Sequence, residues 1–433
     1  MSVIKPILKK ILPFALRQWL KRQFYKYQFN YQFKRKDSKH ENAIERTKLK
    51  EKIRVVFFAL HPGIWKVDTL YKKMIDHPYF EPIILVCPIG SGDKGEILKY
   101  MNLCENMFVD KGYKVVLAYN KKNNTYLNVK KELKPDIIFY TNPYQGRIHK
   151  NYFITNYPDI LTCYVPYSSM IVNSEMQFNK PLTNLLWRFF VDNRFSQDMT
   201  RRYSKDAGKN VVVSGFPSLD VLLDKSYQPK KVWKNDQKIK IIWAPHHTIE
   251  GTESINFATF LQFSDFMVEL TKKYQEYIQV AFKPHPLLYV KLCKIWGNDK
   301  TEEYYTKWEE MSNTQLETGD YIDLFLTSDA MIFDSCSFLN EYLYTKKPSA
   351  FITNDIVQQQ LNDYGLDAFN CHQHVRTEED ITNFIESLKN NNPDPLSAEK
   401  DSYYKKYISM FEEESASERI LSEIINSIYK SRN

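Results

Sequence analysis

Short apolar runs recur along the chain between segments with helical spacing. Six of them fall in the first half and are rich in β-branched and aromatic residues: IRVVFFAL (53–60), EPIILVCP (81–88), KVVLAY (114–119), PDIIFYT (135–141), ILTCYVPY (160–167) and NVVVSGFP (210–217). Runs that are apolar throughout are typical of strands buried on both faces. They predict a parallel sheet with helices on both sides.

The same pattern starts again in the second half. Four further runs indicate strands of a second α/β unit: KIIWAP (240–245), YIQVAFKP (277–284), DAMIFD (329–334) and SAFIT (349–353). The polar segment 222–237 between the halves is a candidate linker, and 398–431 is expected to be helical throughout. Two doubly wound domains in tandem place a ligand cleft at the carboxyl ends of their strands. We expect the domains to span 49–225 and 226–395, with helices over 396–433.

Composition narrows the choice of function. Only 12 of the 433 residues are Gly, and neither a GxGxxG nor a GxxxxGK[ST] segment is present. The sequence therefore gives no support for a glycine-rich dinucleotide-binding site or a P-loop. The six cysteines are dispersed without a CxxC pair, which suits a reducing, cytosolic compartment.

Basic residues are concentrated at the start of the chain. Residues 1–36 hold ten Lys or Arg and no Asp or Glu, so the rest of the chain carries 50 basic against 52 acidic residues. This balance does not indicate a basic domain that binds nucleic acid. Apolar side chains recur among these cations at helical spacing, at Ile4, Ile7, Leu8, Ile11, Leu12, Leu16, Trp19 and Leu20. Segment 1–48 is therefore predicted to associate with an anionic membrane surface through residues 1–36. The alternative is a helix that docks on the protein's own body. An apolar run of about 18 residues, long enough to span a bilayer, is missing.

Histidine is scarce, with nine in the chain, yet three stand at the ends of two predicted strands. WAPHHTIEG (243–251) contains His246 and His247, and AFKPHPLL (281–288) contains Lys283 and His285. A histidine at a strand end is often a structural residue. A His pair can also bind a metal weakly, but a third ligand at recognisable spacing and an acidic DxD-type segment are both missing, so we expect no metal and no cofactor.

A third polar strand end occurs in SDAMIFDSCSFLNEYLYTKKP (328–348). Asp334 ends the strand, Ser335 and Ser337 stand where a helix should begin, and Glu341 follows one turn inside it. A helix N-terminus binds phosphate through its backbone N–H groups, and a carboxylate one turn further can bridge ribose hydroxyls. The imidazoles and Lys283 at the other strand ends can neutralise a diphosphate. Together the three segments therefore predict a nucleoside-diphosphate site.

The series APHHT, FKPHP and SDAMIFDSCSFLNEYLYTKKP resembles the C-terminal half of the CDP-glycerol glycerophosphotransferases, the teichoic-acid primases and polymerases. His285 falls on the His of that family's Lys-x-His-Pro segment. Asp334, Ser337 and Glu341 fall on the Asp, the second Ser and the acidic residue of its Asp-Tyr-Ser-Ser segment and following helix. SGFPSLD (214–220) is similar to the Gly-x-Pro-Arg-Asn-Asp segment that ends the family's first domain.

The resemblance implies a GT-B-like fold with an acceptor domain (49–225) followed by a nucleotide-donor domain (226–395). It implies a transferase of the EC 2.7.8 type that moves glycerol phosphate or another polyol phosphate from a CDP-alcohol and releases CMP. The acceptor would be a lipid-linked glycan or polyol phosphate of teichoic-acid or capsule type, at the cytoplasmic face of the cell membrane. His285 and the helix start at Ser337 would bind the phosphates, Glu341 the ribose, and His246 or His247 the transferred phosphoryl group.

The acceptor side of the resemblance is weaker. The family's Trp-His-Gly-Thr-Pro segment, with its histidine, corresponds here to CYVPYSSM (163–170), which contains no histidine. His61 is our first candidate for the general base and His149 the second. Two alternatives stay open: a GT-B glycosyltransferase that uses a UDP- or GDP-sugar, and a non-catalytic membrane scaffold.

Overall fold

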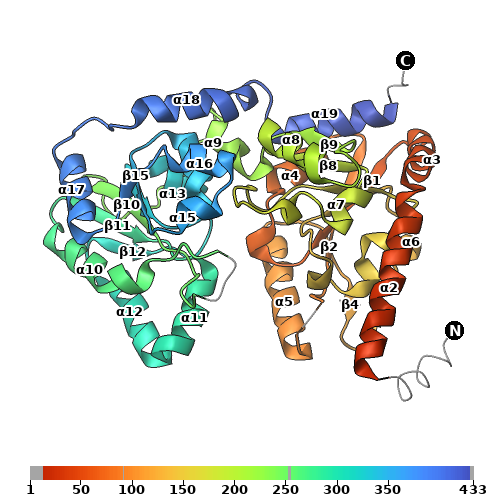
Figure 1. The fold of residues 1–433 in the computed structure, drawn as a ribbon, viewed down its shortest axis with the longest axis horizontal. Coiled ribbons are helices and arrows are strands. Elements are labelled where there is room, and N and C mark those ends of the chain that lie inside the picture. The colour runs from red at the N-terminus through yellow and green to blue at the C-terminus, as the bar shows by residue number, and fades with distance from the viewer. Residues whose placement is uncertain (1–12, 91, 252–254, 430–433) are drawn as a thin grey trace. The chain divides into compact units, whose positions relative to one another are not determined.

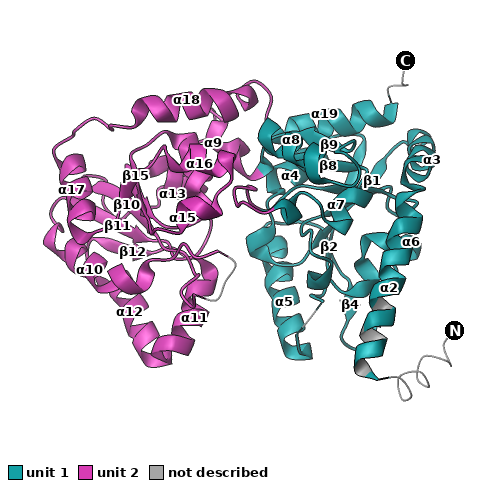
Figure 2. Ribbon diagram, viewed as in Figure 1, with its two compact units in different colours: residues 1–167, 175–217, 416–433 teal, residues 168–174, 218–415 magenta. Residues whose placement is uncertain are grey.

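The computed structural model describes residues 13–90, 92–251 and 255–429. Two compact units divide the chain: residues 1–167, 175–217 and 416–433 form unit 1, and residues 168–174 and 218–415 form unit 2 (Figure 2). The last helix thus belongs to unit 1, although most of the chain before it belongs to unit 2.

Unit 1 is built on a seven-stranded parallel sheet in the order β3-β2-β1-β6-β7-β8-β9 (Figure 1). Its strands are β1 (Ile53–Ala59), β2 (Phe80–Val86), β3 (Val115–Leu117), β6 (Ile137–Tyr140), β7 (Leu161–Tyr164), β8 (Arg188–Val191) and β9 (Val211–Val213). A small antiparallel pair, β4 (Tyr119–Asn120) and β5 (Thr125–Tyr126), stands apart. The helices are α2 (Phe14–Phe33), α3 (Lys36–Lys48), α4 (Asp68–Asp76), α5 (Lys94–Asp110), α6 (Val129–Glu132), α7 (Pro181–Leu185), α8 (Arg194–Tyr203) and α19 (Ala416–Tyr429).

Unit 2 has a six-stranded parallel sheet in the order β12-β11-β10-β13-β14-β15. Its strands are β10 (Ile239–Ala244), β11 (Ile278–Phe282), β12 (Thr314–Leu316), β13 (Ala330–Phe333), β14 (Ser349–Ile352) and β15 (Gln373–Val375). The helices are α9 (Asp220–Leu223), α10 (Phe260–Lys273), α11 (Pro286–Trp296), α12 (Asn298–Glu310), α13 (Ile322–Thr327), α14 (Phe338–Glu341), α15 (Val357–Gln360), α16 (Asp363–Phe369), α17 (Glu378–Lys389) and α18 (Ser397–Tyr407).

Both sheets confirm the predicted doubly wound α/β class. Numbered in chain order within each unit, the strands of unit 2 follow the order 3-2-1-4-5-6 of Rossmann folds, and those of unit 1 extend it by one strand. The order reverses between β1 and β6 in unit 1 and between β10 and β13 in unit 2. Ligands of such sheets bind outside the carboxyl ends of the strands at this reversal.

Aromatic side chains fill both cores. In unit 1 the rings of Phe57 and Phe139 stack with centroids 4.8 Å apart. In unit 2 Trp243 stacks on Phe282 at 4.9 Å, and Trp308 lies 5.1 Å from Trp243. Each of these side chains is buried, and burial of such large apolar areas contributes most of the stability of a domain. The apolar strands are therefore held rigidly, which fixes where their carboxyl ends stand.

One prediction about the C-terminal segment is wrong, because 398–431 is not helical throughout. α18 ends at Tyr407, a 3-10 turn η8 (Ser409–Phe411) follows, and α19 begins only at Ala416. The acidic stretch Glu412–Glu414 lies in this break, where the chain passes from unit 2 to unit 1. α19 then buries Ile420 and Ile424 in the core of unit 1.

Candidate functional site

The three histidines meet at the carboxyl edge of the unit 2 sheet. β11, β10 and β13 are neighbours, so the segments that follow them share one edge. The ring of His247 lies 4.4 Å from that of His246 and 4.1 Å from that of His285, and the rings of His246 and His285 are 5.3 Å apart. The sequence prediction that these strand ends come together is therefore correct in geometry.

Asp334 holds this edge together. Its side chain is fully buried immediately after β13, beside the end of β10. One carboxylate oxygen accepts the backbone N–H of His246 at 2.5 Å, and the other accepts the backbone N–H and the hydroxyl of Thr259 at 2.5 and 2.8 Å. Burial raises the pKa of Asp334 to about 6, and these hydrogen bonds oppose the rise. The carboxylate thus spans the point where strand order reverses and fixes the histidine loop to β13.

The tautomer of His246 follows from its contact with Thr248. The Thr248 hydroxyl oxygen accepts the backbone N–H groups of Phe257 and Ala258, both at 3.2 Å, which occupies its two lone pairs. Its hydrogen must therefore point to its third partner, Nδ1 of His246 at 3.0 Å. Because Nδ1 accepts, the neutral ring carries its proton on Nε2.

His285 also carries its proton on Nε2, because a different group donates to its Nδ1. Its Nδ1 accepts the backbone N–H of Leu287 at 3.1 Å, so the side chain caps the N-terminus of α11. Burial, followed by electrostatic interaction with His247, Lys291 and Lys283, lowers the pKa of His285 to about 3. Burial first, and then the neighbouring imidazoles, also keeps the pKa of His246 well below its usual value. At neutral pH both rings are uncharged and present an Nε2–H donor.

The three rings are close enough to suggest a metal site. One ring nitrogen from each lies within 4.8 Å of the others. A metal ligand, however, must offer a lone pair, and the lone pairs of His246 and His285 already accept hydrogen bonds from Thr248 and Leu287. The Nε2–H groups of His246 and His285 are hydrogen-bond donors, and they are better suited to an anion whose oxygens accept hydrogen bonds.

The other predicted donor-side residues lie around the same edge. Lys283 is buried and donates through Nζ to the carbonyl of Gly319 at 2.7 Å. Glu341 is buried at the end of α14 and accepts the Tyr321 hydroxyl at 2.5 Å. Tyr321 had no sequence signal, because it lies 20 residues from Glu341 in a loop after β12.

The predicted helix start after Asp334 is present but short. α14 begins at Phe338, has Ser337 as its N-cap residue, and is a single turn that continues as the 3-10 turn η7 (Tyr342–Thr345). Ser335 is buried and Ser337 is partly exposed. A single turn has a small dipole, so an anion at this edge would be held more by the side chains than by the helix.

Comparison with known proteins identifies the family. The model described as CDP-Glycerol:Poly(glycerophosphate) glycerophosphotransferase matches residues 166–426, which is more than half of the chain and contains the whole histidine edge. The chain belongs to this family. The predicted family is thereby confirmed. A search of curated protein sequences found no significant match.

Solved structures agree with the glycerophosphotransferase assignment at the level of fold. The wall teichoic acid polymerase TagF, as a histidine-to-asparagine variant with CDPG, is 13% identical at a TM-score of 0.55 and covers 96% of this chain and 98% of that chain. MnaA from S. aureus with UDP is 14% identical at a TM-score of 0.55, and the match covers 88% of this chain and 99% of that chain. UDP-GlcNAc 2-epimerase from Neisseria meningitidis bound to UDP-GlcNAc is 14% identical at a TM-score of 0.55, and the match covers 87% of this chain and 100% of that chain. The fold of this chain is GT-B-like, with two Rossmann-like domains, as predicted.

The candidate bases of unit 1 are both capping residues. His61 follows β1, and its Nδ1 accepts the backbone N–H of Gly63 at 2.9 Å at the start of η1 (Pro62–Ile64). His149 accepts the backbone N–H of Asn151 at 3.4 Å and stacks on Tyr126, with ring centroids 4.1 Å apart. In each neutral ring the proton is therefore on Nε2, and the lone pair that a base needs is occupied. The base role of His61 stays a prediction.

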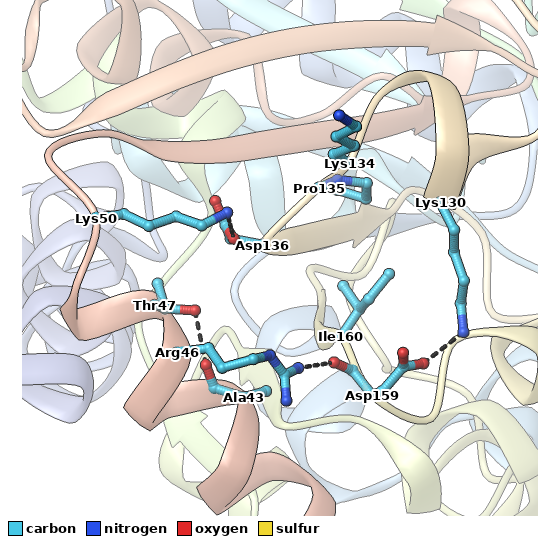
Figure 3. Close-up of a pocket in the computed structure, with 10 residues that line it drawn as sticks. All are labelled: Ala43, Arg46, Thr47, Lys50, Lys130, Lys134, Pro135, Asp136, Asp159 and Ile160. Atoms are coloured by element: carbon cyan, nitrogen blue, oxygen red, sulfur yellow. Dashed lines mark hydrogen bonds and ion pairs between the residues drawn. The ribbon is translucent and has the colours of Figure 1, made fainter.

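A cavity of about 230 Å³ in unit 1 lies at the opposite edge of the sheet (Figure 3). Lys50, Asp136 and Asp159 line it from positions just before β1, β6 and β7, at the amino ends of these strands. Lys50 pairs with Asp136, and Lys130 pairs with Asp159 at 2.5 Å. The cavity is a cluster of ion pairs away from the carboxyl edge, so we do not assign it to catalysis.

Proposed function

We propose that this glycerophosphotransferase-family protein transfers a glycerol-phosphate or related polyol-phosphate unit from a CDP-alcohol to a hydroxyl of a lipid-linked glycan or polyol-phosphate acceptor, with CMP as the leaving group. The observation that carries the proposal is the histidine edge of unit 2. Two neutral imidazoles with fixed Nε2–H donors, and a third beside them, stand where α/β sheets of this order bind phosphate groups.

In this proposal His246, His247 and His285 bind the donor diphosphate. Lys283 is buried near enough to His285 to contribute to the lowered pKa of that ring, and the Ser335 and Ser337 segment lies on the adjacent strand end. As the acceptor oxygen attacks the β-phosphorus, charge spreads over the phosphoryl oxygens and onto the departing CMP. Preoriented N–H donors stabilise this charge without reorganisation. Asp334 contributes by holding His246, and not by touching the donor.

Glu341 is the proposed ribose ligand. Its carboxylate is buried and accepts the Tyr321 hydroxyl, so Tyr321 orients it. The proposal needs no cofactor and no metal, because neutral N–H donors perform the task that a cation performs in sites with carboxylate clusters.

The N-terminal segment is proposed to hold the enzyme at the cytoplasmic face of the membrane. One face of α2 docks on unit 1, where Gln32 donates to the carbonyl of Thr155 at 2.5 Å. The other face is exposed and apolar, with Leu16, Trp19, Leu20, Phe24, Tyr27 and Tyr31 between 41 and 69% exposed. The remaining predicted stripe, from Ile4 to Leu12, lies outside the described residues. Among the helices the structure describes, none is long and apolar enough to cross a membrane.

The test is nucleotide release from a donor panel. Purified full-length protein is incubated with lipid-linked acceptor and CDP-glycerol, CDP-ribitol, UDP-glucose or GDP-mannose. The proposal predicts CMP from a CDP-polyol, lost in His285→Ala. UDP or GDP from a sugar donor would refute polyol-phosphate transfer, and turnover of none of the donors would favour a scaffold.

A further inference from the structure

The cavity of about 230 Å³ in unit 1 lies where the N-terminal extension meets the body of that unit (Figure 3). Its lining residues come from both sides of this junction. The extension supplies Ala43, Arg46 and Thr47 of α3 and Lys50 just after it, and the body supplies Lys130, Lys134, Pro135, Asp136, Asp159 and Ile160. All of them precede residue 166, where the match to the family begins, so the match gives this cavity no role.

Positive charge exceeds negative charge around this cavity. Four cations and two carboxylates line it, so the net charge of the lining is +2. Both carboxylates are already bonded within the protein. Asp136 accepts Nζ of Lys50 and the backbone N–H of Arg54, and its side chain is 8% exposed. Asp159 accepts Nζ of Lys130. The excess positive charge is therefore carried by the two remaining cations.

These two cations are Arg46 and Lys134, and neither forms an ion pair with a carboxylate in the part of the chain that the structure describes. Arg46 donates through Nη2 to the main-chain carbonyl of Asp159 at 2.5 Å, which uses only one of its several N–H donors. Lys134 follows α6 with a left-handed backbone conformation, φ 47°, in which glycine is favoured. A lysine held in a conformation that costs free energy points to a use for its ammonium at this position.

The cavity is suited to a small anion. Pockets for drug-sized molecules have volumes of about 300–1,000 Å³, so this one has room for a smaller group. Its apolar lining residues Ala43, Pro135 and Ile160 are buried, and a lining without water strengthens the attraction between the cations and an anion. A phosphate group has several oxygens that can accept hydrogen bonds from a guanidinium and an ammonium at once.

The cavity also lies next to the helix that we propose to contact the membrane. α2 docks on unit 1 through the bond from Gln32 to the carbonyl of Thr155, which is four residues before Asp159 of the cavity. α3 begins three residues after the end of α2. An amphipathic helix on an anionic membrane brings lipid phosphates close to neighbouring cations. The phosphate can therefore belong to a lipid headgroup or to a soluble phosphate ester.

We propose that this cavity is a non-catalytic binding site for a phosphate group, in which Arg46 and Lys134 hold the phosphate oxygens. A phosphate bound there contacts α3 and the body of unit 1 at the same time, so it ties the N-terminal extension to the unit. The site is separate from the histidine edge of unit 2, and the inference does not depend on the proposed transfer reaction.

Hydrogen exchange of the full-length protein tests the site locally, which matters because the histidine edge is also expected to bind phosphate. Inorganic phosphate and glycerol 3-phosphate, at equal ionic strength with chloride, should slow exchange in α3 and in residues 129–136. Arg46→Gln and Lys134→Gly should each raise the phosphate concentration needed by about fivefold or more. Lys131→Gln removes an exposed cation of α6 that does not line the cavity, and should change nothing. Lys134→Gly should keep the wild-type Tm, because glycine is favoured at this φ.

Vesicle sedimentation distinguishes the two sources of phosphate. Phosphatidylglycerol vesicles are compared with phosphatidylcholine vesicles that contain oleate at the same surface charge. A preference for phosphatidylglycerol that is lost in Arg46→Gln and Lys134→Gly would assign the site to a lipid headgroup. Unchanged vesicle binding with a weakened response to glycerol 3-phosphate would assign it to a soluble phosphate ester.

Two results would overturn the proposal. One is exchange in α3 that neither phosphate, glycerol 3-phosphate nor phosphatidylglycerol changes. The other is a response that Lys131→Gln weakens as much as the two cavity variants do, because general surface charge would then be sufficient. A normal phosphate response in a protein that releases no CMP from any CDP-polyol would refute the proposed function and leave this site standing.

Discussion

His285 combines a structural and a chemical role that a single substitution can separate. Its Nδ1 caps α11, and its Nε2–H is the proposed phosphate donor. In His285→Asn the side-chain Oδ1 stands at the place of Nδ1, and Asn is among the best N-cap residues, so the cap is kept while the outward donor is lost. His285→Ala loses both. The pair of variants therefore isolates the hydrogen bond to the donor.

The expected magnitudes follow from these two roles. Loss of a hydrogen bond to a charged phosphate costs about 1.5–3 kcal/mol, so His285→Asn should bind CDP-glycerol about 10- to 150-fold more weakly. His285→Ala should show at least the same loss of affinity. In addition it should lose about 0.5–2 kcal/mol of unfolding free energy with the cap, whereas His285→Asn should stay within a few tenths of wild type.

Isothermal titration with CDP-glycerol measures the affinity, and urea unfolding of both variants measures the stability. Wild-type affinity in His285→Asn would refute the assignment of His285 to the phosphates. Equal destabilisation of the two variants would refute the capping role.

Three further predictions concern protons, metals and the membrane. The pKa values of His246 and His285 are lowered in the folded protein, so their contribution to stability is complete above about pH 6.5 and falls, by up to about 1.4 kcal/mol per pH unit for each group, as pH drops. Because both rings are uncharged from pH 8 to pH 6, they should bind CDP-glycerol without taking up protons in this range; calorimetry in buffers of different ionisation heat that finds proton uptake would contradict the neutral state. Treatment with EDTA should leave the transfer rate unchanged, since the ring lone pairs accept hydrogen bonds, and a loss of rate restored by Zn²⁺ would reverse our assignment of the cluster. Replacing Phe24, Tyr27 and Tyr31 by Ser should reduce sedimentation with anionic vesicles, while Tyr79→Ser, an exposed aromatic outside α2, should not; equal binding by both variants would argue against α2 as the anchor.

Most strands of the two parallel sheets could be predicted because their sequences are apolar throughout, and the three strands of these sheets that were missed have a physical reason. β8 begins three residues after α7 ends, within the run LLWRFFV (185–191), where periodicity does not separate the end of the helix from the strand. β12 and β15 are the edge strands of the unit 2 sheet and have three residues each. Edge strands need no continuous apolar run, since only part of their surface is buried. The return of α19 to unit 1 depends on tertiary packing that no local pattern records.

The position of the site was more accessible to sequence reasoning than its chemistry. Polar residues at the ends of buried strands predicted that the segments of His246, His285 and Asp334 would meet. The protonation pattern could not be predicted, because it depends on backbone N–H groups of Phe257 and Ala258 that the fold brings to Thr248.

The measurement that tests the central claim most directly is ³¹P NMR of the products formed from CDP-glycerol and lipid-linked acceptor. The account predicts CMP as a phosphomonoester and a new phosphodiester on the acceptor, because the bond between the two phosphates breaks. CDP among the products, with no new acceptor phosphodiester, would mean that the enzyme cleaves the bond to the alcohol instead, and would contradict polyol-phosphate transfer.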